Sequence, residues 1–304
     1  MKEFIDSTLT KNSKARLIET IPVNQLIKGY KKELKIDVSR FFKDIPEIGI
    51  YECEKTKYRF YYPFNIEGDS SFYQELQQYD WYYMPWKWEH ETIKNILSIN
   101  EKILEVGSGG LGFVERMQQS GFNITGLELN RDSIVKGEKL NLNVLNETIQ
   151  EHSTKHFEEY DVVCSFQVLE HISDVESFLK AQIDCLKKGG KLIISVPNNS
   201  SFIKLTSGLY LNKPPHHMGL WDKKSLISLT KLFDLKIEKV MFEPLAKYHL
   251  DWYISLTTQN KIYKVKLFKV AFKKLKIINI YTSLIKKFRT KIKGHSMLVV
   301  YNKI

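Results

Sequence analysis

The sequence predicts an α/β protein with a doubly wound, mostly parallel seven-stranded sheet whose last strand is antiparallel. Two observations predict this sheet. From Lys102 onward, short apolar segments alternate with helical segments of about 10–15 residues, which is typical of strand–helix–strand units. The first apolar segment also runs directly into a glycine-rich turn that opens a helix.

The expected elements follow one another without an internal repeat or a low-complexity linker. In chain order, the expected strands are 102–107, 123–129, 142–149, 160–166, 191–198, 235–243 and 295–303. Apolar residues at helical spacing predict helices over 111–121, 132–142, 175–190 and 225–234.

Three parts of the chain differ in composition. Residues 1–90 are rich in aromatic side chains and are expected to form a small subdomain that caps the site, with some aromatics in its core and some at a ligand pocket. Residues 91–243 and 294–304 are expected to form the sheet domain. Residues 244–293 interrupt it as a basic helical insertion.

The positive charge is confined to one end of the chain. The 304 residues carry a net charge of +11, yet residues 252–304 hold 12 Lys, one Arg and no acid, which gives them +13. Residues 1–251 therefore sum to −2. A nearly neutral body disfavours nucleic acid as a partner, and the basic segment carries no recognised nucleic-acid motif.

Composition excludes several classes of protein and site. Apolar residues at 43% and charged residues at 27% exclude disordered, collagen-like and coiled-coil chains. Three widely spaced cysteines, Cys53, Cys164 and Cys185, argue against a disulfide framework or a structural zinc site. The first residues lack the apolar segment of a signal peptide, so we expect a cytoplasmic protein.

The glycine-rich turn is the clearest sign of a ligand site. Gly107, Gly109 and Gly112, with Ser108 between the first two, follow the first strand and allow a ligand to approach the backbone at a helix N-terminus. Such a turn serves nicotinamide dinucleotides as well as other nucleoside cofactors. Glu105 decides between them, because its carboxylate would repel a pyrophosphate and attract a cationic ligand.

Glu128 is the second expected cofactor residue. It ends the second strand, 21 positions after Gly107, where a carboxylate can accept both ribose hydroxyls of a nucleoside. A solvated strand-end residue is the alternative interpretation.

These motifs resemble a known enzyme family. The segment ILEVGSGGLGF and the later run DVVCSFQVLEHISDVESFLKAQIDCLKKGGKLIISVPN are similar to motifs of class I S-adenosylmethionine (SAM) methyltransferases, over about half of the chain. Leu111 departs from the commonest glycine spacing. The resemblance implies a Rossmann-like fold, SAM as cofactor, and contributions to its site from Leu129, Thr148, Ile149, Phe166 and, from the segment before the domain, Tyr83. The subgroup that it resembles most is associated with polysaccharide and secondary-metabolite genes.

Three histidines are the candidate catalytic residues. His171 follows the fourth strand, and His216 and His217 follow the fifth, after two prolines. A histidine titrates near neutral pH and can take the proton of an acceptor hydroxyl. The family resemblance implies that the loop of His217 covers the substrate; a histidine that only fixes the loop is the alternative. We expect no metal site, because adjacent residues seldom point to one centre and no carboxylate spacing supports one.

The basic insertion allows two interpretations. Val265, Phe268, Phe272 and Leu275 recur at helical spacing beside a stripe of lysines. Such a helix can lie as a lid on the domain, or residues 260–293 can contact an anionic membrane from its cytoplasmic face.

The sequence thus predicts a SAM-dependent methyltransferase that acts on an oxygen of a small-molecule acceptor, a glycan, a nucleotide-linked sugar or a lipid-linked intermediate. Three alternatives remain open: transfer to nitrogen or carbon of a small metabolite, a non-catalytic protein of the same fold that tethers a complex to a membrane, and a nicotinamide-dependent oxidoreductase.

Overall fold

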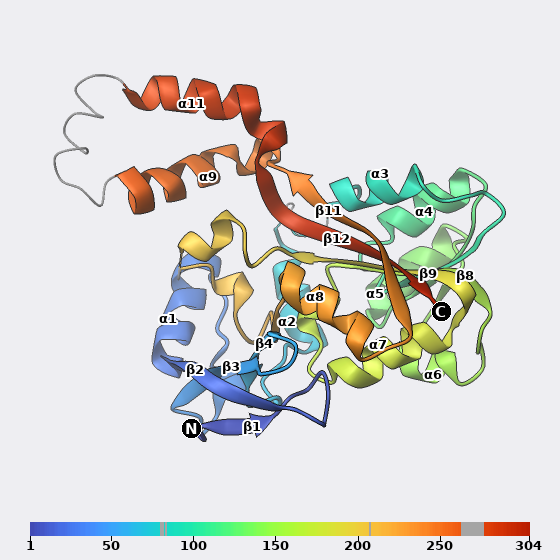
Figure 1. Ribbon diagram of the computed structural model, residues 1–304, viewed down its shortest axis with the longest axis horizontal. Coiled ribbons are helices and arrows are strands. Elements are labelled where there is room, and N and C mark those ends of the chain that lie inside the picture. The colour runs from blue at the N-terminus through green and yellow to red at the C-terminus, as the bar shows by residue number, and fades with distance from the viewer. Residues whose placement is uncertain (80–81, 83, 207, 263–276) are drawn as a thin grey trace.

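The structure is a computed structural model that describes residues 1–79, 82, 84–206, 208–262 and 277–304. Its strands form two sheets (Figure 1). The larger sheet has the order β11–β12–β9–β8–β5–β6–β7. Its strands span β5 Lys102–Val106, β6 Asn123–Leu127, β7 Val144–Leu145, β8 Tyr160–Phe166, β9 Leu186–Pro197, β11 Leu235–Pro244 and β12 Lys293–Lys303.

Each of the seven predicted strands has a counterpart in this sheet. Strands β5 to β9 pair with one another in parallel, whereas β12 lies between β9 and β11 and is antiparallel to both. The predicted fold class is therefore confirmed. The third strand is shorter than expected, because only Val144 and Leu145 pair with β6.

The helices flank the sheets and fill the connections between strands. They span α1 Val23–Leu34, α2 Ser70–Leu76, α3 Trp88–Lys94, α4 Gly112–Gln119, α5 Arg131–Lys139, α6 Ile149–Ser153, α7 Val175–Asp184, α8 Lys223–Ser228, α9 Leu250–Thr257 and α11 Ile277–Phe288.

Both faces of the larger sheet are buried. Ile103 of β5 belongs to an apolar cluster with residues of α3 and α4, and its neighbour Leu104 belongs to a cluster with residues of α7 and α8. Successive side chains of a strand point to opposite faces. A strand covered on both faces reads as a continuous apolar run, which is why these strands were predictable from the sequence.

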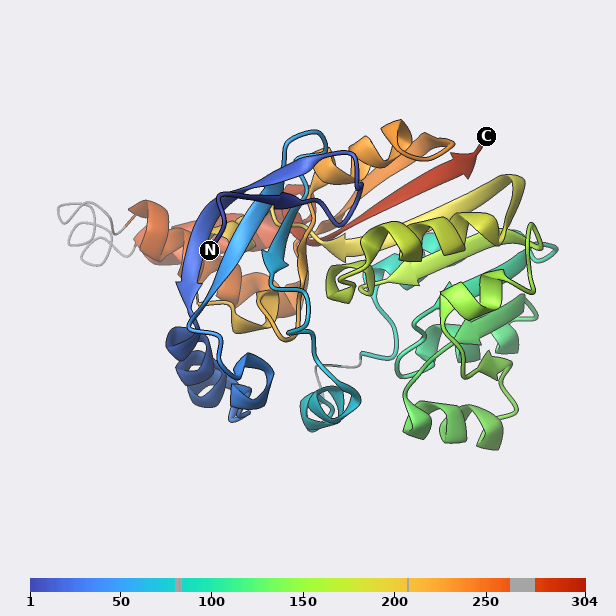
Figure 2. The same cartoon turned by 90° about the horizontal axis from the view of Figure 1, so that it is seen from below.

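The second sheet includes a strand from the second half of the chain. Its order is β1–β2–β3–β4–β10, and its strands span β1 Phe4–Asp6, β2 Lys14–Pro22, β3 Glu47–Cys53, β4 Arg59–Tyr62 and β10 Gly219–Leu220. Gly219 pairs with Phe60, and the ring of Trp221 stacks on that of Tyr58 at 4.1 Å between centroids. Figure 2 shows the N-terminal strands on one side of the molecule and the larger sheet on the other. The N-terminal part is thus joined to the sheet domain by strand pairing.

The insertion begins and ends with helices. In Figure 1, α9 and α11 lie side by side and project from the end of β11 and β12. Leu256 of α9 belongs to an apolar cluster with Phe202 and Leu245, against which Ile285 of α11 packs. The apolar stripe expected at Val265, Phe268, Phe272 and Leu275 lies outside the described residues. Within the described part of the chain, none of the helices is long and apolar enough to span a bilayer.

Candidate functional site

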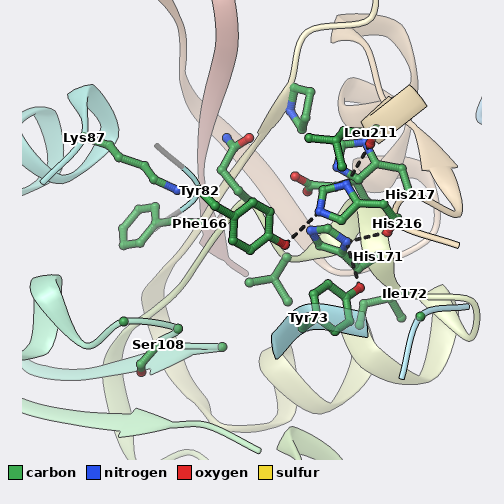
Figure 3. Close-up of a pocket in the computed structure, with 18 of the residues that line it drawn as sticks. Tyr73, Tyr82, Lys87, Ser108, Phe166, His171, Ile172, Leu211, His216 and His217 are labelled. Carbon is green, nitrogen blue, oxygen red and sulfur yellow. Dashed lines mark hydrogen bonds between the residues drawn. The ribbon is translucent and has the colours of Figure 1, made fainter. Parts of the chain in front are cut away.

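A cavity of about 1280 Å³ lies at the carboxyl ends of the parallel strands. One part of its wall is the glycine-rich turn after β5, together with Glu128, Leu129, Thr148 and Ile149. Another part holds His171, His216 and His217 (Figure 3). In an open α/β sheet this edge is where ligands bind. The expected cofactor residues and the expected catalytic histidines thus line one cavity.

The glycines of the turn serve two different purposes. Gly107 has φ +75°, and a Cβ there would lie 2.7 Å from Val168 Cγ2. Gly109, with φ +52°, also takes the left-handed conformation that favours glycine. At Gly112 a Cβ would lie 2.1 Å from the carbonyl oxygen of Pro85. Gly112 therefore accommodates the chain that precedes α3, although its place in the turn predicted a role in cofactor binding alone.

Glu105 presents a buried carboxyl group beside this turn. It is 3% exposed, and its Oε2 atom finds no hydrogen-bond partner among the described residues. Burial, together with the nearby Glu128 carboxylate, raises the pKa of this carboxyl to about 8, although a hydrogen bond from the Ser108 side chain acts in the opposite direction. A buried carboxyl of this kind is costly unless a partner is supplied. The site therefore favours a ligand with a positive charge or a hydrogen-bond donor at this position.

Glu128 holds the turn in place. Its Oε2 atom accepts a hydrogen bond from the Gly109 N–H at 2.5 Å, and its Oε1 atom accepts from Leu129 and Asn130 at 2.8 Å each. Burial raises the pKa of this carboxyl, and the three N–H groups lower it. An ionised carboxylate has about four acceptor positions, so one remains for a ligand hydroxyl.

The remaining expected cofactor residues have mixed environments. Leu129 is 59% exposed at the cavity, and Ile149 is buried there. Thr148 caps the N-terminus of α6 by accepting a hydrogen bond from the Glu151 N–H. Phe166, at the end of β8, packs edge-on against Phe113. Tyr83 lies outside the described residues.

The three histidines form one cluster. Their ring centroids lie 4.5–4.8 Å apart, and the rings of His216 and His217 are stacked at an interplanar angle of 20°. His171 belongs to the turn Leu169–His171 after β8, whereas the other two precede β10, whose pairing with β4 fixes the end of their loop. The rings of the adjacent residues His216 and His217 therefore lie face to face.

Burial keeps these imidazoles neutral. It lowers the pKa of His171 to about 4 and holds those of His216 and His217 well below the usual range. The neighbouring imidazoles lower the pKa values of His216 and His217 further. A neutral imidazole offers one lone pair, either to a proton or to a metal ion.

Several cavity residues were missed in the sequence. Glu89 and Glu170 are buried, and each has at least one carboxyl oxygen without a hydrogen-bond partner in the part of the chain that the structure describes. Glu243, the last but one residue of β11, also lines the cavity, and burial raises its pKa to about 7. Glu170 could have been found from the sequence, because it directly precedes the candidate residue His171. Glu89 and Glu243 could not, because no motif or spacing in the sequence relates them to the site.

Two groups of side chains within the described residues have the geometry to hold a metal ion. One is the cluster of His171, His216 and His217, and the other consists of Glu147, His152 and His156. In each group, one potential ligand atom per residue lies within 4.8 Å of the others.

Comparison with known proteins adds a family relationship. A family model described as a methyltransferase domain matches residues 81–240, which is more than half of the chain. A ubiquinone biosynthesis O-methyltransferase of Salmonella enteritidis is 31% identical over 151 residues, which cover 47% of this chain and 62% of the relative. The protein of the same name from Escherichia fergusonii is 32% identical over 106 residues, covering 33% and 44%. The chain thus spans about half to three fifths of the length of these relatives.

Among solved structures, a SAM-dependent methyltransferase from Archaeoglobus fulgidus is similar, with a TM-score of 0.47 and 21% identity. The alignment covers 70% of this chain and 94% of that one.

Proposed function

The chain belongs to the class I SAM-dependent methyltransferases, and from that premise we propose that it transfers the methyl group of SAM to a hydroxyl oxygen of its acceptor. The observation that carries this proposal is one cavity that joins a buried Glu105 carboxyl, whose Oε2 atom has no partner among the described residues, to a cluster of neutral imidazoles. Its two parts have the chemistry of a cofactor site and of an acceptor site.

The residues at the turn fit SAM. Gly107 brings the backbone close to the cavity, and Oε2 of the Glu105 carboxyl lacks a partner there among the described residues. Such a group suits the cationic methionine end of the cofactor. Glu128 has an acceptor position left for the ribose hydroxyls, and Leu129, Thr148 and Ile149 line the wall for the adenine. When bound, SAM supplies a methyl group that is activated by the adjoining positive sulfur.

The chain's own contribution to the reaction is positioning and proton uptake. Holding the acceptor atom close to the methyl group and in line with it accounts for about 7–11 kcal/mol of a barrier in favourable cases. A hydroxyl must also lose its proton, and the neutral His217 or His171 imidazole can accept it.

Oxygen is favoured over nitrogen or carbon as the methyl acceptor for two reasons. A hydroxyl benefits from the imidazole cluster, whereas a neutral amine needs no base. The curated relatives also carry the name ubiquinone biosynthesis O-methyltransferase. We propose a lipid-linked or sugar-linked hydroxyl compound as the acceptor, in keeping with aromatic walls at Tyr210, Tyr248 and Trp252.

The helix α11 supports a place for this chemistry at a membrane. Ile280, Leu284 and Phe288 follow one another at intervals of four residues and are 60%, 50% and 45% exposed. Lys286, Lys287 and Arg289 lie in or next to the last turn of the same helix. An exposed apolar stripe flanked by positive charge suits the surface of an anionic bilayer.

Calorimetric titration with SAM tests the cofactor half of the proposal. The wild-type chain is expected to bind SAM and not NADH, and Glu128→Ala is expected to weaken SAM binding. Glu138→Ala, on the exposed surface of α5, is the matched control and is expected to bind SAM like the wild type. A wild-type chain without affinity at millimolar SAM would refute the enzyme assignment. Labelled SAM incubated with fractionated lipid and glycan extracts then identifies the acceptor.

A further inference from the structure

Hydrogen bonds fix the orientation of each ring in the imidazole cluster, which the uptake of a proton alone does not require. The Nδ1 atoms of His171, His216 and His217 each lie at hydrogen-bond distance from a carbonyl or amide oxygen of the protein. His171 Nδ1 lies 2.6 Å from the carbonyl oxygen of His216, and His216 Nδ1 lies 2.7 Å from that of Leu211. A carbonyl oxygen only accepts hydrogen bonds, so both Nδ1 atoms carry the proton. The Nε2 atoms of these two rings therefore carry the lone pairs.

The orientation of the third ring is fixed through two asparagines. The Asn199 side-chain amide donates to the carbonyl oxygen of Trp221 at 3.1 Å, which leaves its Oδ1 atom to accept from Asn212 Nδ2 at 2.7 Å. Asn212 must then present Oδ1 to His217 Nδ1, at 3.0 Å. Nδ1 of His217 is therefore the donor, and Nε2 of this ring also carries a lone pair.

This pattern is the one that metal-binding histidines show. Such a histidine donates its second ring N–H to a carbonyl or carboxylate oxygen, which fixes the tautomer and the direction of the ring. We propose that His171, His216 and His217 bind one divalent ion of the zinc type on the acceptor side of the cavity. The potential ligand atoms of the three residues lie within 4.8 Å of one another. Figure 3 shows the three rings gathered at the cavity, with dashed hydrogen bonds from the cluster to Leu211, Tyr73 and Tyr82.

One side chain competes with the ion. The hydroxyl of Tyr82 lies 2.8 Å from His216 Nε2 and donates to it. An ion at the cluster takes that lone pair, so the Tyr82 hydroxyl has to turn away when the ion binds. Tyr82 belongs to the segment before α3, so its side chain can move without a movement of the loop that carries His216 and His217.

The second group of potential ligands differs in its carboxylate, whose two oxygens are already paired within the protein. Glu147 Oε1 lies 2.8 Å from His152 Nδ1, and Glu147 Oε2 lies 3.4 Å from the Lys155 ammonium. His156 Nδ1 pairs with Glu159 at 2.5 Å. The group of Glu147, His152 and His156 therefore serves as the internal control for ion binding.

The ion gives the acceptor site a defined chemistry, a consequence that rests on the proposed function. Three protein ligands leave a fourth position of a tetrahedral zinc-type ion open, as in catalytic sites. An acceptor hydroxyl in that position would have a lowered pKa and would release its proton to water. Proton uptake by His171 or His217 then applies to the ion-free chain, whereas in the ion-bound chain the three imidazoles hold the ion.

Metal binding to the full chain tests the site without any methyl acceptor. The protein is stripped with a chelator, dialysed against ZnCl2 and analysed for zinc content, and then titrated with Co²⁺ while visible absorption is recorded. We expect one ion per wild-type chain and cobalt bands of a nitrogen-ligated site. His217→Ala and His171→Ala are expected to lose this ion, and Asn212→Ala to bind it about 10–100-fold more weakly. His156→Ala is expected to bind as the wild type does.

Two results would overturn the site. One is a wild-type chain without a bound ion, and the other is equal binding by the wild type and His217→Ala. Circular dichroism and SAM titration of the same samples show whether each variant is folded; Asn212→Ala keeps the test decisive if a histidine variant fails to fold. Zinc binding without SAM binding would refute the proposed function and leave the metal site, and the reverse would refute the metal site alone.

Discussion

Gly112 lies against Pro85 so closely that a single added carbon would be 2.1 Å from the proline carbonyl oxygen. This contact joins the start of α4, the helix that follows the cofactor turn, to the chain that carries Tyr82 and leads into α3. The atom opposite Gly112 belongs to the backbone, so rotation of a side chain cannot relieve an overlap.

Gly112→Ala is expected to destabilise the protein by about 1–3 kcal/mol, because extra volume in a tightly packed site forces the backbone to shift. It is also expected to weaken SAM binding, since the displaced segment borders the cavity. Thermal unfolding and calorimetry measure the two effects. Gly208→Ala is the control, because its added carbon would meet Thr206 Oγ1 at an ordinary 3.5 Å. If Gly112→Ala is as stable as the wild type, the backbone at Pro85 can shift without cost and the prediction is wrong.

Glu105→Gln is expected to change stability and cofactor binding in opposite directions. The pKa of this carboxyl rises from 4.5 to about 8 on folding, so the folded state binds more protons between these values. Stability is therefore lost as pH rises from about 4.5 to 8. The variant avoids that loss, and its gain in unfolding temperature over the wild type is expected to be larger at pH 8 than at pH 5.

The same carboxyl gives SAM binding a proton signature. A cationic ligand beside Glu105 lowers the pKa of the group, so binding near pH 7 is expected to release a proton. Calorimetry in buffers of different ionisation enthalpy measures this release. Glu105→Gln is expected to bind SAM more weakly and to release less; equal proton release by the two proteins would assign the signal to another group.

His217→Ala is expected to lower methyl-transfer turnover by about 10²–10⁴-fold while leaving the dissociation constant for SAM unchanged. The residue lies on the acceptor side, away from the glycine-rich turn. Steady-state turnover with labelled SAM, set beside a calorimetric titration, separates the two quantities. Full turnover in the variant would remove His217 from the reaction.

The double variant Ile280→Glu/Leu284→Glu is expected to lose binding to vesicles that contain anionic lipid, because it places negative charge on the exposed stripe of α11. Flotation of the protein with such vesicles measures the effect, and neutral vesicles show how much depends on charge. Phe157→Glu is a suitable control, since Phe157 is 65% exposed but lies elsewhere in the chain. If the double variant floats like the wild type, α11 does not contact the bilayer.

The larger sheet was predictable because its signals are local. Ile103 and Leu104 face opposite sides of a strand that is buried on both, so the apolar run is visible in the sequence. The glycine turn and Glu128 follow from the same local order. The methyltransferase class and SAM as cofactor, both predicted from the resemblance, are confirmed by the family match.

The acceptor side was less predictable because it depends on contacts between distant segments. His171 and His216 are 45 positions apart, and their hydrogen bond exists only once the loop before β10 is folded. Glu89 and Glu243 reach the cavity from α3 and β11, and no spacing in the sequence relates them. The pairing of Gly219 with Phe60 likewise had no local signal, because β10 has only two residues.

That short strand has a consequence for how such an enzyme can diversify. Because β10 pairs with β4 directly after the histidine loop, we expect changes in the N-terminal sheet to affect the acceptor side more than the turn at Gly107. Substitutions among residues 1–62 can therefore alter which molecule is methylated at little cost to cofactor affinity. Grafting this region from a relative with another acceptor would have to include residues 213–221 as well, since either piece alone would meet a foreign strand partner.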